Sequence, residues 1–134
     1  MNRCFVDTNL FLRFLTNDIP EQAVILEKLI EQSRKGKVHL VINTVVIAEI
    51  VWTLQSFYKY SKEKIDEIVS SIVACKAFEI QERNILLQAL EDFHTLNIDF
   101  VDAYVGNWMK ENKIFTIYTL NKKDFQRISG LSVM

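Results

Sequence analysis

Hydrophobic residues along this chain occur in two kinds of segment. Short, nearly continuous runs of β-branched and aromatic residues are typical of strands buried on both faces, whereas longer segments repeat their apolar positions with helical spacing. The short runs predict strands over residues 3–6, 38–42, 78–80 and 115–118 and at the C-terminus. The longer patterns predict helices over residues 9–15, 20–35, 45–58, 62–74, 83–95, 101–112 and 125–128.

Residues at the ends of these segments agree with several of the helices. Pro20 suits the first turn of its helix, where a backbone N–H would be unpaired in any case. Gly36 follows the same helix at the position that favours a left-handed backbone. Thr44 and Ser61 precede helical patterns, and their hydroxyls can accept a free backbone N–H. We therefore expect both residues to be N-caps.

The order of the elements indicates the fold class. Strands separated by helical patterns of about ten residues or more are typical of βαβ units, and so of a mostly parallel sheet with helices on both faces. The chain has 134 residues, of which 49% are hydrophobic, with only three Gly and one Pro. Such a composition leaves little room for a linker. We predict one α/β domain over residues 1–134, a three-layer α/β/α sandwich.

Acidic and amide residues lie where this fold would bring them to one edge. The carboxyl ends of parallel strands share an edge with the N-termini of the crossover helices, and open α/β folds bind ligands there. Asp7 and Asn121 follow predicted strands, while Glu49 and Asp102 lie near the starts of predicted helices. The predicted edge collects six candidate side chains: Asp7, Glu49, Asp99, Asp102, Asn121 and Asp124.

Several carboxylates in one cavity favour a bound cation. Like charges repel at short range, and a desolvated carboxylate costs several kcal/mol unless it is paired or binds a cation. A set of oxygen ligands without His or Cys favours Mg²⁺ or Mn²⁺ over zinc. Such ions activate water and neutralise the charge that develops on a phosphoryl group. The sequence therefore favours phosphodiester hydrolysis.

Four short motifs carry the candidate residues: 6–10 (VDTNL), 48–50 (AEI), 99–103 (DFVDA) and 119–125 (TLNKKDF). In this order they resemble the PIN-domain ribonucleases of the VapC toxin type, over essentially the whole chain. The resemblance implies that Asp7, Glu49 and Asp102 are catalytic and form the metal-binding core, with Thr8 or Asn9 supporting Asp7. It also implies an RNA substrate, a small antitoxin that inhibits the site, and a homodimer.

The chain departs from the family pattern at two places. Asn121 stands where the family often has Asp, and an amide oxygen is a weaker, neutral ligand. This departure leaves open whether Asp99 or Asp124 completes the metal shell, and whether one or two ions bind. The small residues usual after the Asp102-Ala103 pair are also altered, and the residues found there are Tyr104, Gly106, Asn107 and Trp108.

Most of the candidate acids also have a structural interpretation. Asp7 and Asn9 could cap the next helix, and Glu49 could face solvent. Asp99 fits an N-cap, whereas Asp102 fits the first turn beside the helix dipole and is the ligand we expect of the two. Asp124 could cap the short helix over residues 125–128 instead of binding metal.

Other conspicuous residues have simpler interpretations. Trp52 lies at helical spacing among apolar residues, which predicts a core position, with a dimer surface or a groove for an inhibitory partner as the alternative. Trp108 carries the same ambiguity. Lys122 and Lys123 flank the predicted site, and Arg13 follows Asp7 closely, so these three cations could contact phosphate.

Composition narrows the remaining choices. A net charge of −1 and a pI near 6.1 argue neither for nor against nucleic acid, which would need a local basic patch. Cys4 and Cys75 match no zinc-ligand spacing and suggest reduced, buried thiols. No stretch has the length of a membrane span or the form of a signal peptide. We expect a soluble, cytoplasmic protein.

Three other functions compete with nuclease activity. A phosphatase of the haloacid-dehalogenase kind needs a second Asp two residues after the first, and Asn9 occupies that position. A receiver-type phosphoacceptor needs a paired acidic site that the strand ends do not supply. A degenerate PIN-like module that binds RNA or a protein without cleavage is the stronger alternative, because Asn121 replaces an acid.

Overall fold

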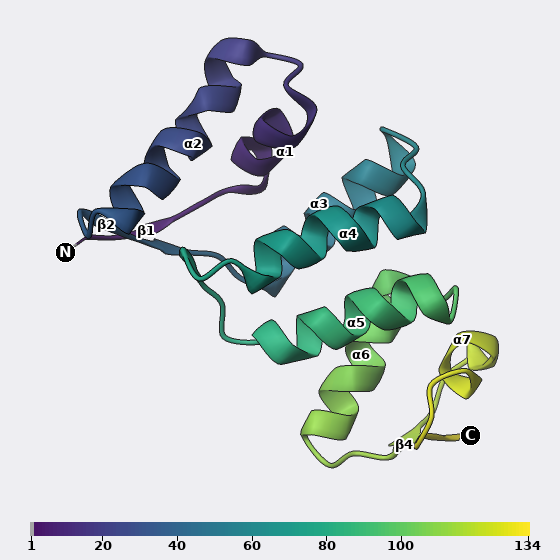
Figure 1. Ribbon diagram of the computed structural model, residues 1–134. Coiled ribbons are helices and arrows are strands. Elements are labelled where there is room, and N and C mark those ends of the chain that lie inside the picture. Colours follow the sequence, from purple (N-terminus) through teal and green to yellow (C-terminus); the bar gives the residue numbers. More distant parts are fainter. Residues whose placement is uncertain (1) are drawn as a thin grey trace.

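One or two helices separate successive strands in the computed structural model, which describes residues 2–134 (Figure 1). The elements are β1 (Asn2–Phe5), α1 (Thr8–Thr16), α2 (Pro20–Arg34), β2 (Val38–Val41), α3 (Thr44–Ser56), α4 (Lys62–Ala74), β3 (Phe78–Glu79), α5 (Arg83–Thr95), α6 (Phe100–Glu111), β4 (Thr116–Ile117), α7 (Lys122–Gln126) and β5 (Ser132–Val133). Helices α4 and α5 have their predicted bounds, and the bounds of the other long helices differ by one or two residues.

The predicted helix ends are confirmed at three positions and wrong at a fourth. Pro20 is the first residue of α2, and Gly36 has the left-handed φ of 76°. The Ser61 hydroxyl accepts the Lys64 N–H and caps α4. Thr44 does not cap α3, because it is already the first helical residue. Instead, the side chain of Asn43 accepts the Val46 N–H at 3.2 Å.

The short helix near the C-terminus begins earlier than predicted. We expected residues 125–128, but α7 spans Lys122–Gln126 with Asn121 at its N-cap position. Asp124 lies in the first turn and does not cap the helix, so that structural interpretation was wrong. The reason is tertiary: an Asp124 carboxylate oxygen accepts the backbone N–H of Asp99.

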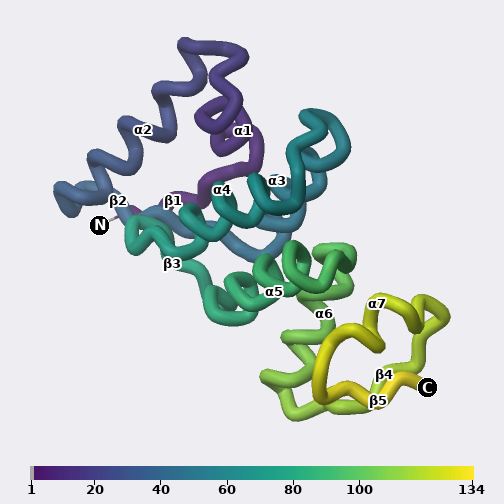
Figure 2. Tube along the Cα trace, turned by 45° about the vertical axis from the view of Figure 1, so that its right-hand side comes forward, coloured from purple at the N-terminus to yellow at the C-terminus, as the bar shows by residue number. Residues whose placement is uncertain are grey.

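All the described strand pairs are parallel, as predicted. One sheet has the order β1-β2-β3, with Cys4 opposite Leu40 and Leu40 opposite Phe78. A second, two-stranded sheet pairs β4 with β5. Figures 1 and 2 both show β4 at the far end of α6, away from β1, and Figure 2 shows β5 beside β4. Among residues 2–134, no strand pairing joins the two sheets.

Burial is deepest around β2 and the helices α3, α4 and α5. Leu40 in β2, Ile47 and Ile50 in α3 and Leu86 in α5 are completely inaccessible to solvent. Phe11 of α1 packs against Phe78 of β3, with ring centroids 5.2 Å apart. This core holds the helices around the parallel strands and presents the carboxyl ends of β1 and β2 to the start of α3.

Two predictions of burial were wrong. Strand β1 was expected to be buried on both faces, but Asn2, Arg3 and Phe5 are exposed. Its outer edge is unpaired among the described residues, so one flank of the strand has no neighbour. Trp52 was expected in the core but is 67% exposed, because it faces a groove between α3 and α6. Helical spacing alone did not indicate which face of α3 would be covered.

Glycine allows α6 to approach the C-terminal segment closely. A Cβ atom at Gly106 would lie 2.5 Å from Cδ1 of Ile128, too close for van der Waals contact. Ile128 and Phe125 are both buried at this junction. The absence of a side chain at Gly106 therefore allows the segment that contains α7 to pack closely against α6.

Candidate functional site

Four of the six predicted residues meet where α6 and α7 begin. The Asn121 side-chain N–H donates to an Asp102 carboxylate oxygen at 2.5 Å. The Asp99 backbone N–H donates to Asp124 at 3.2 Å, and the Asp99 carboxylate caps α6 by accepting the Val101 N–H at 3.1 Å. The predicted N-cap role of Asp99 is thus confirmed. Three carboxylates and one amide form this cluster, which we call the α6–α7 cluster.

The carboxylates of the α6–α7 cluster influence one another. Burial raises the pKa of Asp102 to about 6, and a hydrogen bond shared with Asp124 and the charges of Asp99 and Asp124 act in the same direction. Burial also acts to raise the pKa of Asp124, but the N–H of Asp99 and the hydrogen bonds with Asp102 and Asn121 outweigh it and hold this pKa below its ordinary value. A cation at this place would relieve the repulsion between the carboxylates.

Lys62 is a neighbour of the cluster that the sequence gave no reason to select. It is the first residue of α4, and its ammonium donates to the Ile98 carbonyl at 2.8 Å. Burial lowers the pKa of Lys62, and the charges of Asp99 and Asp124 oppose that shift. The ammonium therefore places a positive charge beside the acidic cluster.

Asp7 lies between β1 and α1, as predicted. It occupies the N-cap position of α1, but its side chain makes no capping hydrogen bond, and its backbone carbonyl accepts the Leu10 N–H at 3.2 Å. Its carboxylate is exposed and unused by the helix. The next residue, Thr8, is buried, and its hydroxyl has no hydrogen-bond partner in the part of the chain described.

Glu49 lies on the second turn of α3 and faces a groove. The groove has a volume of about 460 Å³ and is lined by Glu49, Trp52, Val101 and Tyr104 among others. Val101 is the neighbour of Asp102 in α6. The Glu49 side chain is exposed, which agrees with the alternative that it faces solvent. No hydrogen bond joins Glu49 or Asp7 to the α6–α7 cluster within residues 2–134.

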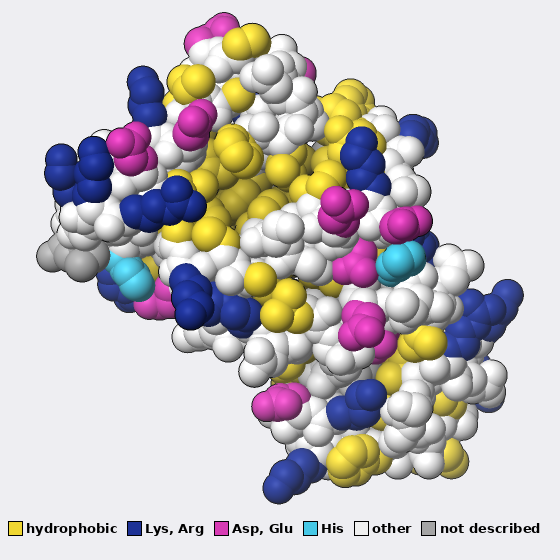
Figure 3. Space-filling view, viewed as in Figure 1, with side chains coloured by type: hydrophobic (Ala, Val, Ile, Leu, Met, Phe, Trp, Pro, Cys, Tyr) yellow, Lys and Arg dark blue, Asp and Glu magenta, His cyan; other side chains and the backbone are white. Residues whose placement is uncertain are grey.

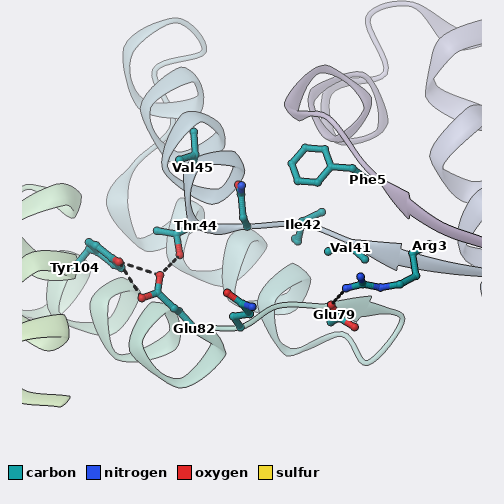
Figure 4. A pocket seen from close by; sticks show the side chains of 11 residues that line it. Arg3, Phe5, Val41, Ile42, Thr44, Val45, Glu79, Glu82 and Tyr104 are labelled. Carbon is teal, nitrogen blue, oxygen red and sulfur yellow. Dashed lines mark hydrogen bonds and ion pairs between the residues drawn. The ribbon is translucent and has the colours of Figure 1, made fainter. Parts of the chain in front are cut away.

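A second cavity, of about 650 Å³, lies over the exposed face of the three-stranded sheet (Figure 4). At one end, Thr44 and Tyr104 donate to Glu82 at 2.5 and 2.9 Å. At the other end, Arg3 and Glu79 form an ion pair. Burial and the Glu82 carboxylate raise the pKa of Tyr104 to about 12. No sequence motif indicated this network, because its residues lie far apart in the chain.

The altered residues of α6 have structural roles. Asn107 is buried and donates to the Asp92 carboxylate and to the Ala103 carbonyl, both at 2.8 Å. Tyr104 is held by Glu82 as described above. These contacts fasten α6 to α5, and they explain why larger and polar side chains stand where small ones were expected.

The three cations that could contact phosphate differ in whether other side chains already bind them. The Arg13 guanidinium is engaged by Asp18 at 3.1 Å and by Gln22 at 3.1 Å, and so is directed away from Asp7. Lys122 and Lys123 begin α7 beside Asn121 and are exposed. Only these two lysines of the three expected cations lie free beside the α6–α7 cluster.

The oxygen donors fit a hard divalent cation better than a soft one. Carboxylate and amide oxygens are available at Asp102, Asp124 and Asn121. Burial, and after it the neighbouring carboxylates, raises the pKa of Asp102, and a cation at this place would favour its ionised form. Within residues 2–134, however, no three Asp, Glu, His or Cys side chains are arranged to enclose an ion. Asp7 and Glu49 would have to join the cluster to complete such a shell.

The architecture and the acidic strand ends define a class: a parallel α/β protein with a carboxylate and amide cluster beside the end of a strand. Comparison with known sequences gives the family. The PIN domain family profile matches residues 4–131, and the chain belongs to this family. Helices packed around parallel strands are consistent with its three-layer α/β/α fold.

A curated relative extends this result. The chain is 28% identical over 98 residues to a VapC ribonuclease of Aquifex aeolicus (strain VF5), a match that covers 73% of this chain and 72% of the relative. The resemblance expected from the four motifs is therefore confirmed at the level of the family. In the described part of the chain, no helix combines the length and apolarity needed to span a membrane.

Proposed function

We propose that this PIN domain is a nuclease, and specifically a Mg²⁺- or Mn²⁺-dependent endoribonuclease. The observation that carries the proposal is the α6–α7 cluster, in which Asn121 holds Asp102 at 2.5 Å inside a fold related to a VapC ribonuclease. Bound at such a site, a divalent ion activates water and offsets the charge that develops on the phosphoryl group.

The chain's own residues have separate roles in this proposal. Asp7, Glu49 and Asp102 would hold the ion, and Asn121, Asp99 or Asp124 would complete its shell. Asn121 orients the Asp102 carboxylate by donating to it, while Asp99 orients Asp124 through a backbone N–H. Lys122 and Lys123 would contact the RNA backbone, since phosphate contacts position a nucleic acid.

The biological setting is the second part of the proposal. The relative is a VapC ribonuclease, which supports RNA as the substrate. We propose in addition that the protein is the toxin of a toxin–antitoxin pair, acts in the cytoplasm as a homodimer and is inhibited by a small antitoxin. Exposed apolar side chains support a protein partner: Trp52 is largely exposed, and Figure 3 shows hydrophobic side chains gathered in the region between α2 and α4.

Cleavage of a panel of structured RNAs by purified protein, free of any partner, tests the proposal. We expect cleavage with Mg²⁺ or Mn²⁺ and none with EDTA. Asp7→Asn and Asp102→Asn should each abolish it, whereas Glu111→Gln, an exposed carboxylate at the far end of α6, should leave it unchanged. Cleavage that persists equally in the two Asp variants contradicts the mechanism.

A non-cleaving RNA- or protein-binding module is the second candidate. It is favoured by the neutral Asn121 and by the separation of Asp7 and Glu49 from the α6–α7 cluster. The same panel distinguishes the two functions, because a binding module would leave every RNA intact with either metal. A module that binds RNA would also retain it in a mobility-shift assay, whereas one that binds only a protein would not.

A further inference from the structure

Glu82 connects three helices that are separated in the sequence. It occupies the N-cap position of α5, but its side chain makes no capping hydrogen bond there. Instead, its carboxylate accepts the Thr44 hydroxyl of α3 at 2.5 Å and the Tyr104 hydroxyl of α6 at 2.9 Å (Figure 4). Hydrogen bonds from hydroxyls to a carboxylate are shorter and stronger than those between neutral groups. One carboxylate therefore ties the start of α3 to α6.

The two hydroxyls that Glu82 binds lie between the sheet cavity and the groove. Thr44 and Tyr104 line both the cavity of about 650 Å³ over the sheet and the groove of about 460 Å³ that Glu49 faces. In the groove, Thr44 and Glu49 belong to the wall formed by α3. Val101 and Tyr104 belong to the opposite wall, formed by α6. The contacts with Glu82 thus join the two walls of the groove at the start of α3.

Each helix that Glu82 ties also carries a residue of the candidate site. Glu49 follows Thr44 by just over one turn of α3, and Asp102 precedes Tyr104 by two positions of α6. At 3.6 residues per turn, side chains two positions apart point about 200° apart around the helix axis. A contact at Tyr104 therefore fixes the rotation of α6, and with it the direction of Asp102. The contact at Thr44 fixes the start of the helix that carries Glu49.

A second carboxylate of α5 provides a comparison. Asp92 also binds α6, because the side-chain N–H of Asn107 donates to it at 2.8 Å. Its other side-chain donor, Gln88, lies on α5 itself, at 3.0 Å. Asp92 therefore fastens α6 to α5, whereas Glu82 also reaches α3. Without the Glu82 carboxylate, α6 would stay attached to α5 through Asp92, while the tie between α3 and α6 would be lost.

We propose that Glu82 is a positioning residue of the candidate site. By accepting hydrogen bonds from α3 and α6, it sets the separation of Glu49 and Asp102 across the groove. This role rests on the proposed function, which assigns both of these carboxylates to a divalent ion. Residues that orient metal ligands from outside the coordination shell commonly change metal affinity when they are substituted. Glu82 acts here as a hydrogen-bond acceptor, not as a ligand.

A titration of the purified protein with Mn²⁺, without RNA, tests this role. Glu82→Gln keeps an oxygen that can accept both hydroxyls, whereas Glu82→Leu is similar in size and has no acceptor. We expect the Mn²⁺ affinity to stay within about twofold of wild type in Glu82→Gln and to fall about 10-fold in Glu82→Leu. Glu91→Leu, at an exposed carboxylate of the same helix, should bind Mn²⁺ as wild type does. Wild-type affinity in Glu82→Leu overturns the proposal. So does a Glu82→Gln variant as weak as Glu82→Leu, because the charge and not the hydrogen bonds would then matter.

Two further variants remove the donors and keep the test valid if Glu82→Leu does not fold. Thr44→Val and Tyr104→Phe each delete one hydroxyl and leave the shape of the side chain nearly unchanged. We expect both variants to show wild-type circular dichroism and a loss of Mn²⁺ affinity. Raising the Mn²⁺ concentration should restore single-turnover cleavage in both, because a displaced ligand weakens metal binding and leaves the RNA contacts intact. Wild-type Mn²⁺ affinity in both variants overturns the proposal.

A distance between two spin labels tests the tie without metal or RNA. In a background without the native thiols (Cys4→Ser, Cys75→Ser), the labels are attached at Ser56→Cys and Glu111→Cys, at the ends of α3 and α6. Labelled chains are diluted with unlabelled ones, so that only distances within one chain are measured. We expect the same distribution of distances with Glu82 and with Glu82→Gln, and a shifted or broader one with Glu82→Leu.

These measurements separate the failure of the tie from the failure of the nuclease. An unchanged distribution of label distances in Glu82→Leu overturns the proposal whatever the protein does to RNA. If wild type binds no Mn²⁺ and cleaves no RNA, the proposed function fails, while the label distances still decide whether Glu82 sets the spacing of α3 and α6.

Discussion

The two sheets, β1-β2-β3 in the N-terminal part of the chain and β4-β5 in the C-terminal part, differ in how completely they are covered. In the N-terminal part, β2 is paired on both sides, and Leu40 at its centre is completely buried. In the C-terminal part, β4 is paired on one side, and the neighbouring Tyr118 is largely exposed. Yet both strands come from apolar runs of the same kind. An apolar run thus indicates that a strand is suited to a buried position. How much of the strand is actually buried depends on the strands and helices that contact it.

The largest expected effect is a difference in lost stability between a substitution in the N-terminal part and one in the C-terminal part. Leu40→Ala leaves a cavity in a core that cannot relax fully, and should lower the free energy of unfolding by about 2–5 kcal/mol. Ile117→Ala, at a half-buried position of β4, should cost less than half as much at low protein concentration. Urea denaturation of both variants measures the difference. Equal losses in dilute protein would remove the contrast between the two parts.

The junction between α6 and the C-terminal segment should show the next largest effect. Gly106→Ala places a methyl group 2.5 Å from Cδ1 of Ile128, and such overpacking costs about 1–3 kcal/mol. Ile128→Val removes that methyl group, so Gly106→Ala should cost less in the Ile128→Val background. Denaturation of the two single variants and the double variant gives the coupling. The same cost in both backgrounds would show that this contact does not hold the segment.

A smaller effect is expected from the cap of α4, which belongs to the N-terminal part alone. Ser61→Ala removes the acceptor for the Lys64 N–H and should cost about 1 kcal/mol, whereas Ser61→Asp keeps an acceptor and should cost little. Thermal unfolding of both variants measures this. Because α4 lies in the N-terminal part, the Ser61→Ala loss should be independent of protein concentration. An equal loss in Ser61→Asp would show that the cap contributes nothing.

The smallest effect concerns pH in the C-terminal part. The pKa of Asp102 is raised from 3.8 to about 6 by burial and by the neighbouring carboxylates. Between these values the folded protein keeps a proton that the unfolded chain has released, so stability should fall as pH rises through this range. In Asp124→Asn the pKa of Asp102 should move down toward its ordinary value. A carboxyl titration by NMR measures both, and an Asp102 midpoint near 3.8 in wild type contradicts the interpretation.

Local signals account for what the sequence predicted well. The helix α4 has its predicted bounds because a serine cap and a helical apolar period act within a few residues of each other. Asp99 was recognised as an N-cap for the same reason. At α3 the local signal was ambiguous by one position, since Asn43 and Thr44 can both cap a helix. The Thr44 hydroxyl instead donates a hydrogen bond to Glu82, which lies far away in the sequence.

Long-range contacts account for what the sequence could not predict. The meeting of Asp102 with Asn121 was anticipated, because strand ends and helix starts share an edge in parallel sheets. The separation of Asp7 from them was not, since it depends on which strands pair. Trp52 illustrates the same limit: helical spacing placed it among apolar residues, but only the position of α6 determines that it faces a groove.

The most direct test of the proposed nuclease is a side-by-side measurement of Asp102→Asn and Glu111→Gln on one RNA that wild type cleaves. Single-turnover rates with Mg²⁺ and with Mn²⁺ should fall by about 100-fold or more in Asp102→Asn, because a ligand of the ion is lost. They should be unchanged in Glu111→Gln, which alters a carboxylate on the same helix outside the α6–α7 cluster. Equal rates in the two variants, with either metal, would contradict the assignment of Asp102 to the catalytic site.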